Sequence, residues 1–173
     1  PTARQLVVRR ATPTGWLTTT IPTSTTAAPA LPDHTGVTLA AGDVDGDGLA
    51  DLVVARPSGT STRVVLGRSR GDGSFDWSEE QTFALTGALQ LADVDGDGRI
   101  DLTWNRGNAT STLDVAVSRK GYGAGRWRLL GRQTVAMSML QFADVDGDGD
   151  ADLIGRPVGS DLAVAPAIGD GGF

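Results

Sequence analysis

Four aspartates crowd into one short segment of this chain. In ADVDGDGRIDL, residues 92–102, the carboxylates of Asp93, Asp95, Asp97 and Asp101 fall within nine residues. Like charges at this spacing repel one another, so a compact loop of this kind needs positive charge between them. The pattern recurs as AGDVDGDGLADL at 41–52 and as FADVDGDGDADL at 142–153. Three copies with the same Asp spacing favour metal binding over the alternative, a set of merely solvated acidic turns.

The spacing within each copy predicts an oxygen cage for calcium. Counted from the first Asp, side-chain oxygens come from positions 1, 3, 5 and 9, Gly at position 6 permits a sharp bend, and the carbonyl of position 7 points inward. Calcium takes oxygen ligands in flexible geometry, and the absence of soft ligands disfavours zinc and copper. An EF-hand needs Glu at position 12 and flanking helices, whereas Val54, Trp104 and Gly155 stand there, so the EF-hand is rejected.

The acidic loops are spaced as parts of a larger repeat. Their first aspartates stand at 43, 93 and 144, so the period is 50 to 51 residues, which is typical of propellers and stacked arrays. After each loop come an apolar run such as DLVVARP, an alternating segment such as TRVVLGR, and a Gly-rich turn. A polar strand follows in two copies, EEQTFAL and RLLGRQTV, and an apolar segment leads into the next loop. These patterns predict four short strands per unit, with the acidic loop between the first and the second.

The repeat of 50 to 51 residues divides the chain into units. We expect one unit at 35–84 with loop 43–51, one at 85–135 with loop 93–101, and an incomplete one at 136–173 with loop 144–152. Residues 1–34 are expected to hold the third and fourth strands of a preceding unit and a Pro- and Thr-rich surface loop.

The motif DVDGDGxxDL at a period near 50 resembles the FG-GAP or VCBS repeats of integrin α-subunit β-propellers and many bacterial extracellular proteins. The resemblance covers nearly the whole chain. It implies an all-β fold of consecutive four-stranded antiparallel blades, here a partial β-propeller of about three to three and a half blades. It also implies three Ca²⁺ sites, in which position 7 contributes its carbonyl. The implied ligands are Asp43, Asp45, Asp47, Leu49 and Asp51 in the first loop, Asp93, Asp95, Asp97, Arg99 and Asp101 in the second, and Asp144, Asp146, Asp148, Asp150 and Asp152 in the third.

Composition excludes several classes of protein. Without cysteine there is no disulfide framework, thiolate zinc site or cysteine nucleophile. The net charge of −6 argues against broad nucleic-acid binding, and three divalent cations would bring it to 0. No apolar run approaches the roughly 20 residues of a membrane helix, and the opening PTARQLVVRR lacks the shape of a signal peptide.

Catalysis is not expected. His34 is the only histidine and falls in the Pro- and Thr-rich segment, where solvent exposure is the simpler interpretation. Glu79 and Glu80 are adjacent in a predicted strand, so they point to opposite faces and cannot form a glycosidase pair.

Other motifs have simple explanations as well. Arg70-Gly71-Asp72 spells the tripeptide that integrins recognise, but chance accounts for it. Asn108 begins a glycosylation acceptor that matters only in a eukaryotic secretory host. The four tryptophans, Trp16, Trp77, Trp104 and Trp127, could stack on sugar rings. Trp16 and Trp127 occupy equivalent turn positions, so packing between units is the favoured role for them.

We therefore expect a non-catalytic, calcium-binding extracellular interaction module of a larger secreted or cell-surface protein, in which calcium stabilises the blades. Two alternatives stay open: a propeller scaffold segment of a large bacterial toxin or surface protein, and a calcium-dependent, lectin-like carbohydrate-binding module. The expected partner is a protein or carbohydrate ligand, without nucleic acid or membrane insertion. Open sheet edges at both ends also predict pairing with remaining blades of a parent chain or edge-to-edge self-association.

Overall fold

The computed structural model describes the chain except residues 1–4, 23–35, 79, 107–111 and 119–126. This described part consists of β-strands joined by turns. It contains no helix long and apolar enough to cross a membrane. The strands are β1 (Gln5–Thr12), β2 (Gly15–Pro22), β3 (Thr38–Gly42), β4 (Asp51–Ser58), β5 (Ser61–Ser69), β6 (Phe75–Trp77), β7 (Gln81–Phe83), β8 (Ala88–Ala92), β9 (Asp101–Asn105), β10 (Thr112–Ser118), β11 (Trp127–Thr134), β12 (Met137–Ala143), β13 (Asp152–Pro157) and β14 (Ala163–Ala165).

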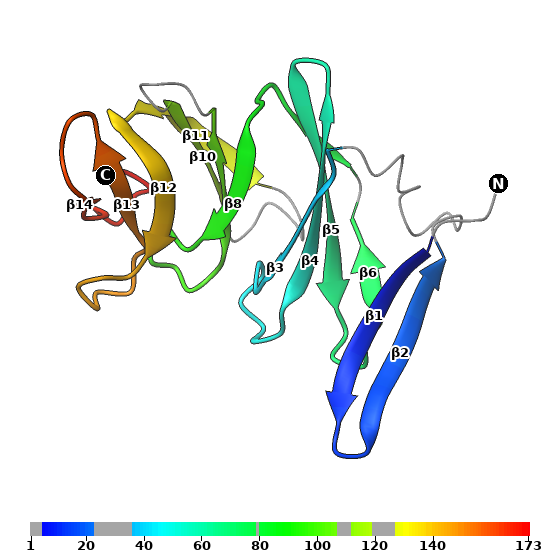
Figure 1. Ribbon diagram of the computed structural model, residues 1–173. Coiled ribbons are helices and arrows are strands. Elements are labelled where there is room, and N and C mark those ends of the chain that lie inside the picture. The colour runs from blue at the N-terminus through cyan, green and yellow to red at the C-terminus, as the bar shows by residue number, and fades with distance from the viewer. Residues whose placement is uncertain (1–4, 23–35, 79, 107–111, 119–126) are drawn as a thin grey trace.

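The strands form a hairpin and three larger sheets. β1 and β2 make the hairpin. The first sheet has the order β3-β4-β5-β6 with β7 also paired to β5, the second β8-β9-β10-β11, and the third β12-β13-β14. The three sheets follow one another through the molecule in chain order (Figure 1), and every described strand pair is antiparallel. The predicted all-β fold with antiparallel strands is therefore confirmed.

The outer position of the first sheet differs from the single strand expected at EEQTFAL. Two short strands, β6 and β7, pair with opposite ends of β5. Between them the Ser78 N–H donates to the Leu66 carbonyl, while the Leu66 N–H donates to the Ser78 hydroxyl at 3.1 Å. A side-chain hydroxyl thus takes the place of a backbone acceptor, and the ladder is interrupted there.

The apolar core lies between successive sheets. One cluster joins the first sheet, through residues such as Val53 and Leu66, to Trp104 of the second sheet. Another joins Val94, at the end of the second sheet, to Leu153 of the third. Burial of apolar side chains stabilises a fold in proportion to the area removed from water, so the contacts between sheets are where this chain gains its stability.

The tryptophans divide between the core and the surface. Trp104 and Trp127 are buried between the first two sheets, at 0% and 4% exposure, and Trp77 is half-buried beside the ring of Phe75. Trp16 in β2 is 69% exposed. The packing role expected of these side chains is therefore confirmed for Trp127 and wrong for Trp16.

Candidate metal centres

Each acidic loop connects the first two strands of a sheet. Strand pairing fixes its two ends, because the residue before position 1 lies opposite position 9. Gly42 pairs with Asp51 in the first sheet and Ala92 with Asp101 in the second, and the third sheet repeats this with Ala143 and Asp152. Positions 1 and 9, which are eight residues apart in sequence, are thereby brought close together.

The aspartates at positions 1, 3 and 9 gather at that place. In each loop their carboxylate oxygens lie within 4.8 Å of one another. The three groups are Asp43, Asp45 and Asp51; Asp93, Asp95 and Asp101; and Asp144, Asp146 and Asp152. These three clusters can each hold a metal ion through carboxylate oxygens, which are the ligands that hard cations prefer.

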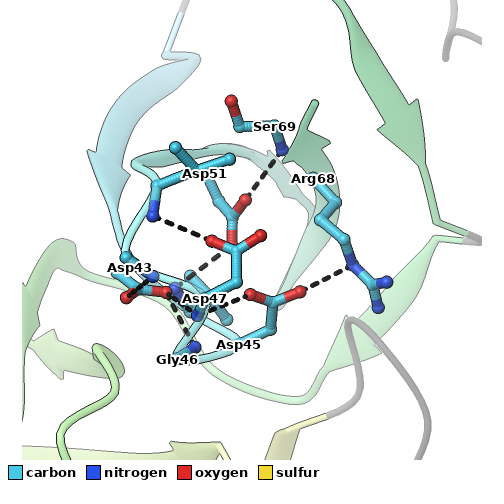
Figure 2. A network of polar contacts seen from close by, with 10 residues as sticks. Asp43, Asp45, Gly46, Asp47, Asp51, Arg68 and Ser69 are labelled. Carbon is cyan, nitrogen blue, oxygen red and sulfur yellow. Dashed lines mark hydrogen bonds and ion pairs between the residues drawn. The ribbon is translucent and has the colours of Figure 1, made fainter. Parts of the chain in front are cut away.

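The position 1 carboxylate shapes the turn around itself. Asp43 Oδ1 accepts from the Gly46 N–H at 2.7 Å and its Oδ2 accepts from the Gly48 N–H at 2.8 Å (Figure 2). Both glycines have φ near +80°, at +81° and +83°, a conformation that residues with a Cβ rarely adopt. Asp144 makes the corresponding bonds to Gly147 and Gly149. Glycine at position 6 is therefore required by the backbone, as the sequence suggested, and so is glycine at position 4.

The position 9 carboxylate has a structural role that sequence reasoning missed. Asp51 is fully buried, with its Oδ2 accepting from the Val44 N–H at 3.1 Å and its Oδ1 from the Ser69 N–H at 2.8 Å. In the third sheet Asp152 accepts from Val145 and Ala167, each at 2.9 Å. These bonds tie the acidic loop to the end of the third strand or the turn just after it, so this carboxylate is needed even without a cation.

We expect Asp101→Ala to destabilise the protein by about 1–3 kcal/mol in the presence of chelator, because it leaves a buried N–H without its acceptor. Asp101 Oδ2 accepts from the Val94 N–H at 3.1 Å, and both residues are 0% exposed. Denaturant unfolding in chelator measures the loss, and Asp47→Ala, at the exposed position 5, is the control. Equal losses in the two variants would contradict the structural role of position 9.

The second loop contains carboxylate oxygens that lack any donor. Asp93 Oδ1 and Asp95 Oδ1 are buried atoms without a hydrogen-bond partner among the described residues. Burial raises the pKa of Asp95, and the neighbouring carboxylates of Asp97 and Asp93 raise it further. The ionised Asp95 carboxylate therefore lowers the stability of the folded protein as the pH rises through its raised pKa, and acidification restores that stability. A bound cation would relieve it at neutral pH, so these residues fit a divalent ion.

The position 9 carboxylates differ in their electrostatics. Burial outweighs the two N–H bonds at Asp51 and raises its pKa. At Asp152 the N–H bonds from Ala167 and Val145 dominate and lower the pKa. Asp152 therefore contributes stability above its unfolded pKa of about 3.9, and that contribution is lost as the pH falls through the folded value.

The aspartates at position 5 lie outside the three clusters. Each accepts from the N–H of position 7 through its Oδ1: Asp47 from Leu49, Asp97 from Arg99 and Asp148 from Asp150, at 2.8, 3.0 and 2.9 Å. The prediction of positions 5 and 7 as ligands stays a prediction.

Two arginines pair with carboxylates of the acidic loops, one of them with a member of a cluster. Asp45 Oδ2 lies 2.9 Å from Arg68 Nε (Figure 2), and Asp97 forms an ion pair with Arg99. Among the described ion pairs none involves the third loop. The three clusters are thus chemically similar but electrostatically unequal.

Other candidate residues lie apart from these clusters. His34, Glu79 and Asn108 fall outside the described residues. Arg70-Gly71-Asp72 lies in an exposed turn, where Arg70 pairs with Asp76 and Asp72 Oδ1 accepts from the Ser74 N–H at 2.8 Å. Arg56 in β4 pairs with Glu80.

Comparison with known proteins agrees with the sequence motif. Residues 43–104 match the sequence model of the FG-GAP-like repeat. This span includes the first two acidic loops and most of β9, and it confirms the predicted resemblance to FG-GAP repeats. Neither a curated protein nor a solved structure gives a significant match to the chain.

Proposed function

We propose, from the FG-GAP-like repeat at residues 43–104, that this protein is a calcium-binding interaction module of the propeller type. Each acidic loop holds one Ca²⁺, and the ion stabilises the fold instead of taking part in a reaction. Consecutive sheets correspond to propeller blades in this proposal, and ligands bind to a surface that the blades support.

The observation that carries this proposal is the repeated meeting of three carboxylates at positions 1, 3 and 9. Three negative charges within 4.8 Å of one another repel strongly in a partly buried site. In the second loop two of their oxygens have no donor within the described residues. A cation supplies the missing positive charge in all three loops.

The chemistry of the ligands favours calcium over other cations. Every ligand in these clusters is a carboxylate oxygen, a ligand that calcium accepts in variable geometry, whereas magnesium requires a near-ideal octahedron. Thiolate and imidazole ligands, which zinc prefers, are absent from the clusters. Extracellular calcium is abundant enough for sites of modest affinity, so we place the module outside the cell.

A binding or scaffold role suits the rest of the molecule better than catalysis. The described carboxylate clusters are all in the loops and are assigned to cations in this proposal. The ligand is proposed to be a protein. The carbohydrate alternative has fewer aromatic platforms than the sequence suggested, because Trp104 and Trp127 are buried.

Asp95→Ala tests the proposal. Because one of three sites is removed, the variant is expected to lose at least about one third of the calcium-induced rise in the unfolding midpoint, and more than a third where the hydrogen bonds between neighbouring loops couple their sites. Its metal-free form is expected to be no less stable than the wild type at neutral pH, because a carboxylate with a raised pKa has been removed.

Asp72→Ala is the matched control, since it removes an exposed carboxylate from a turn outside the acidic loops. Its calcium response is expected to equal that of the wild type. Thermal unfolding with calcium and with chelator measures both variants, and an unchanged response in Asp95→Ala would overturn the assignment of the second loop.

A further inference from the structure

The acidic loops of neighbouring sheets contact one another through a repeated hydrogen bond. The N–H of position 8 in one loop donates to the carbonyl of position 1 in the preceding loop. Ile100 donates to the Asp43 carbonyl at 2.8 Å, and Ala151 donates to the Asp93 carbonyl at 2.7 Å. Position 7, the residue just before each donor, is thereby held beside the preceding loop.

The side chain at position 7 lies on the glycine at position 4 of that preceding loop. A Cβ at Gly46 would lie 3.3 Å from Arg99 Cγ, and a Cβ at Gly96 would collide with the carboxylate of Asp150. The other oxygen of this carboxylate, Asp150 Oδ2, would lie 3.3 Å from a Cβ at Gly169. Glycine at position 4 of the second loop therefore leaves room for a carboxylate from the third loop.

The two junctions place opposite charges on the preceding loop. At the first junction the position 7 residue is Arg99, whose guanidinium pairs with Asp97, outside the cluster of its own loop. At the second junction it is Asp150, which is half-buried and whose carboxylate has neither a hydrogen-bond donor nor an ion-pair partner in the described part of the chain. Burial raises the pKa of Asp150, and the carboxylates of Asp148 in its own loop and Asp93 in the second loop raise it further. The charge of Asp150 thus acts on both loops.

The second loop also lacks a hydrogen bond at the place where Asp150 meets it. In the first and third loops, the Oδ1 of position 1 accepts from the N–H of Gly46 or Gly147 at position 4, at 2.7 and 2.6 Å. In the second loop Asp93 Oδ1 is a buried atom without a partner among the described residues, so the Gly96 N–H does not make this bond. The second loop therefore receives a negative charge from its neighbour where it already has a carboxylate oxygen without a donor.

We propose that the side chain of Asp150 belongs to the metal site of the second loop. This inference rests on the proposed function, in which that loop holds Ca²⁺. The ion is then attracted by a fourth carboxylate in addition to those of the second cluster, and this carboxylate comes from the next repeat. The motif assigns only the backbone carbonyl of position 7 to a site, in its own loop, whereas here the side chain of position 7 raises the calcium affinity of the preceding loop.

Calcium titration of a chain that keeps only the second site tests this role. Asp45→Ala and Asp146→Ala each remove one carboxylate of the first and third clusters, and this double variant is expected to bind one ion. Adding Asp150→Asn is expected to weaken its calcium affinity about tenfold, the effect of one unit charge on a divalent ion roughly 6 Å away in water. Asn keeps the shape of the side chain and the backbone carbonyl, so the charge is what changes. If Asp150 acted on the third loop alone, the affinity would stay the same, because that site has already been removed.

The matched control is Asp161→Asn in the double variant, which removes one negative charge from an exposed turn between β13 and β14 and is expected to leave the affinity unchanged. Asp150→Ser repeats the measurement if the Asn variant melts early in chelator. If the double variant binds no calcium while the wild type does, the same substitutions are made in Asp146→Ala, and one of its two affinities is expected to fall.

The two possible failures are distinguishable. A wild-type chain that binds no calcium overturns the proposed function itself. Calcium binding that Asp150→Asn and Asp150→Ser leave unchanged, or that Asp161→Asn weakens equally, overturns the role of Asp150 and leaves the metal sites in place.

Discussion

Removal of calcium by a chelator is expected to lower the free energy of unfolding by about 2.7 kcal/mol for each loop whose site was held at one hundred times its Kd. The reason is the charge in each loop, where three carboxylates meet within 4.8 Å. The folded chain binds the ion, but the unfolded chain separates these carboxylates and has no comparable site. Loss of the ion therefore destabilises only the folded form.

Urea unfolding at fixed free calcium, and again in chelator, measures this difference. Magnesium at the same concentration is expected to restore less stability, because it requires a near-ideal octahedron and gives up its waters reluctantly. A free energy of unfolding that is the same in calcium and in chelator would contradict a stabilising role for the ion.

Trp104→Ala is expected to cost about 3–5 kcal/mol, the range found when a large buried aromatic is truncated. Trp104 is 0% exposed, and its ring centroid lies 4.9 Å from that of Phe83 in the neighbouring sheet. Its removal opens a cavity in the cluster that joins the first and second sheets. The variant is therefore expected to weaken the junction between sheets.

Denaturant unfolding provides the measurement, with Trp16→Ala as the control. Trp16 is 69% exposed, so its truncation is expected to change stability by no more than about 0.5 kcal/mol. Trp104→Phe is expected to be milder than Trp104→Ala, because it keeps a ring and removes an indole N–H that has no partner among the described residues. Similar losses in Trp104→Ala and Trp16→Ala would contradict the assignment of the core.

The acidic clusters were predictable because their geometry is local. Positions 1 and 9 flank a turn between two paired strands, so the pairing of Gly42 with Asp51 brings Asp43 and Asp51 together. Local patterns also predicted the all-β fold, since alternating apolar residues indicate strands and closely spaced turns leave no room for long helices. The position 5 aspartates lie outside the clusters, and the Oδ1 of each accepts a hydrogen bond from the N–H of position 7.

Contacts between distant segments could not be predicted in the same way. Nothing in the spacing of Asp43 and Ile100 indicates that the backbone of one bonds the other, because that contact depends on how two sheets pack. The outer position of the first sheet is shared by β6, which precedes EEQTFAL, and β7, which lies within it, and this division also depends on a distant partner, the Leu66 backbone bonded by Ser78. The double hydrogen bonding of buried Asp51 likewise involves Ser69, which is contributed by β5.

Isothermal titration of calcium into the metal-stripped chain tests the central claim most directly. Three bound ions per chain are predicted, one for each cluster of three aspartates, with two in Asp95→Ala. The sites need not have equal affinity, since Arg68 pairs with Asp45 of the first cluster. A titration in which the wild-type chain binds no calcium would contradict the account.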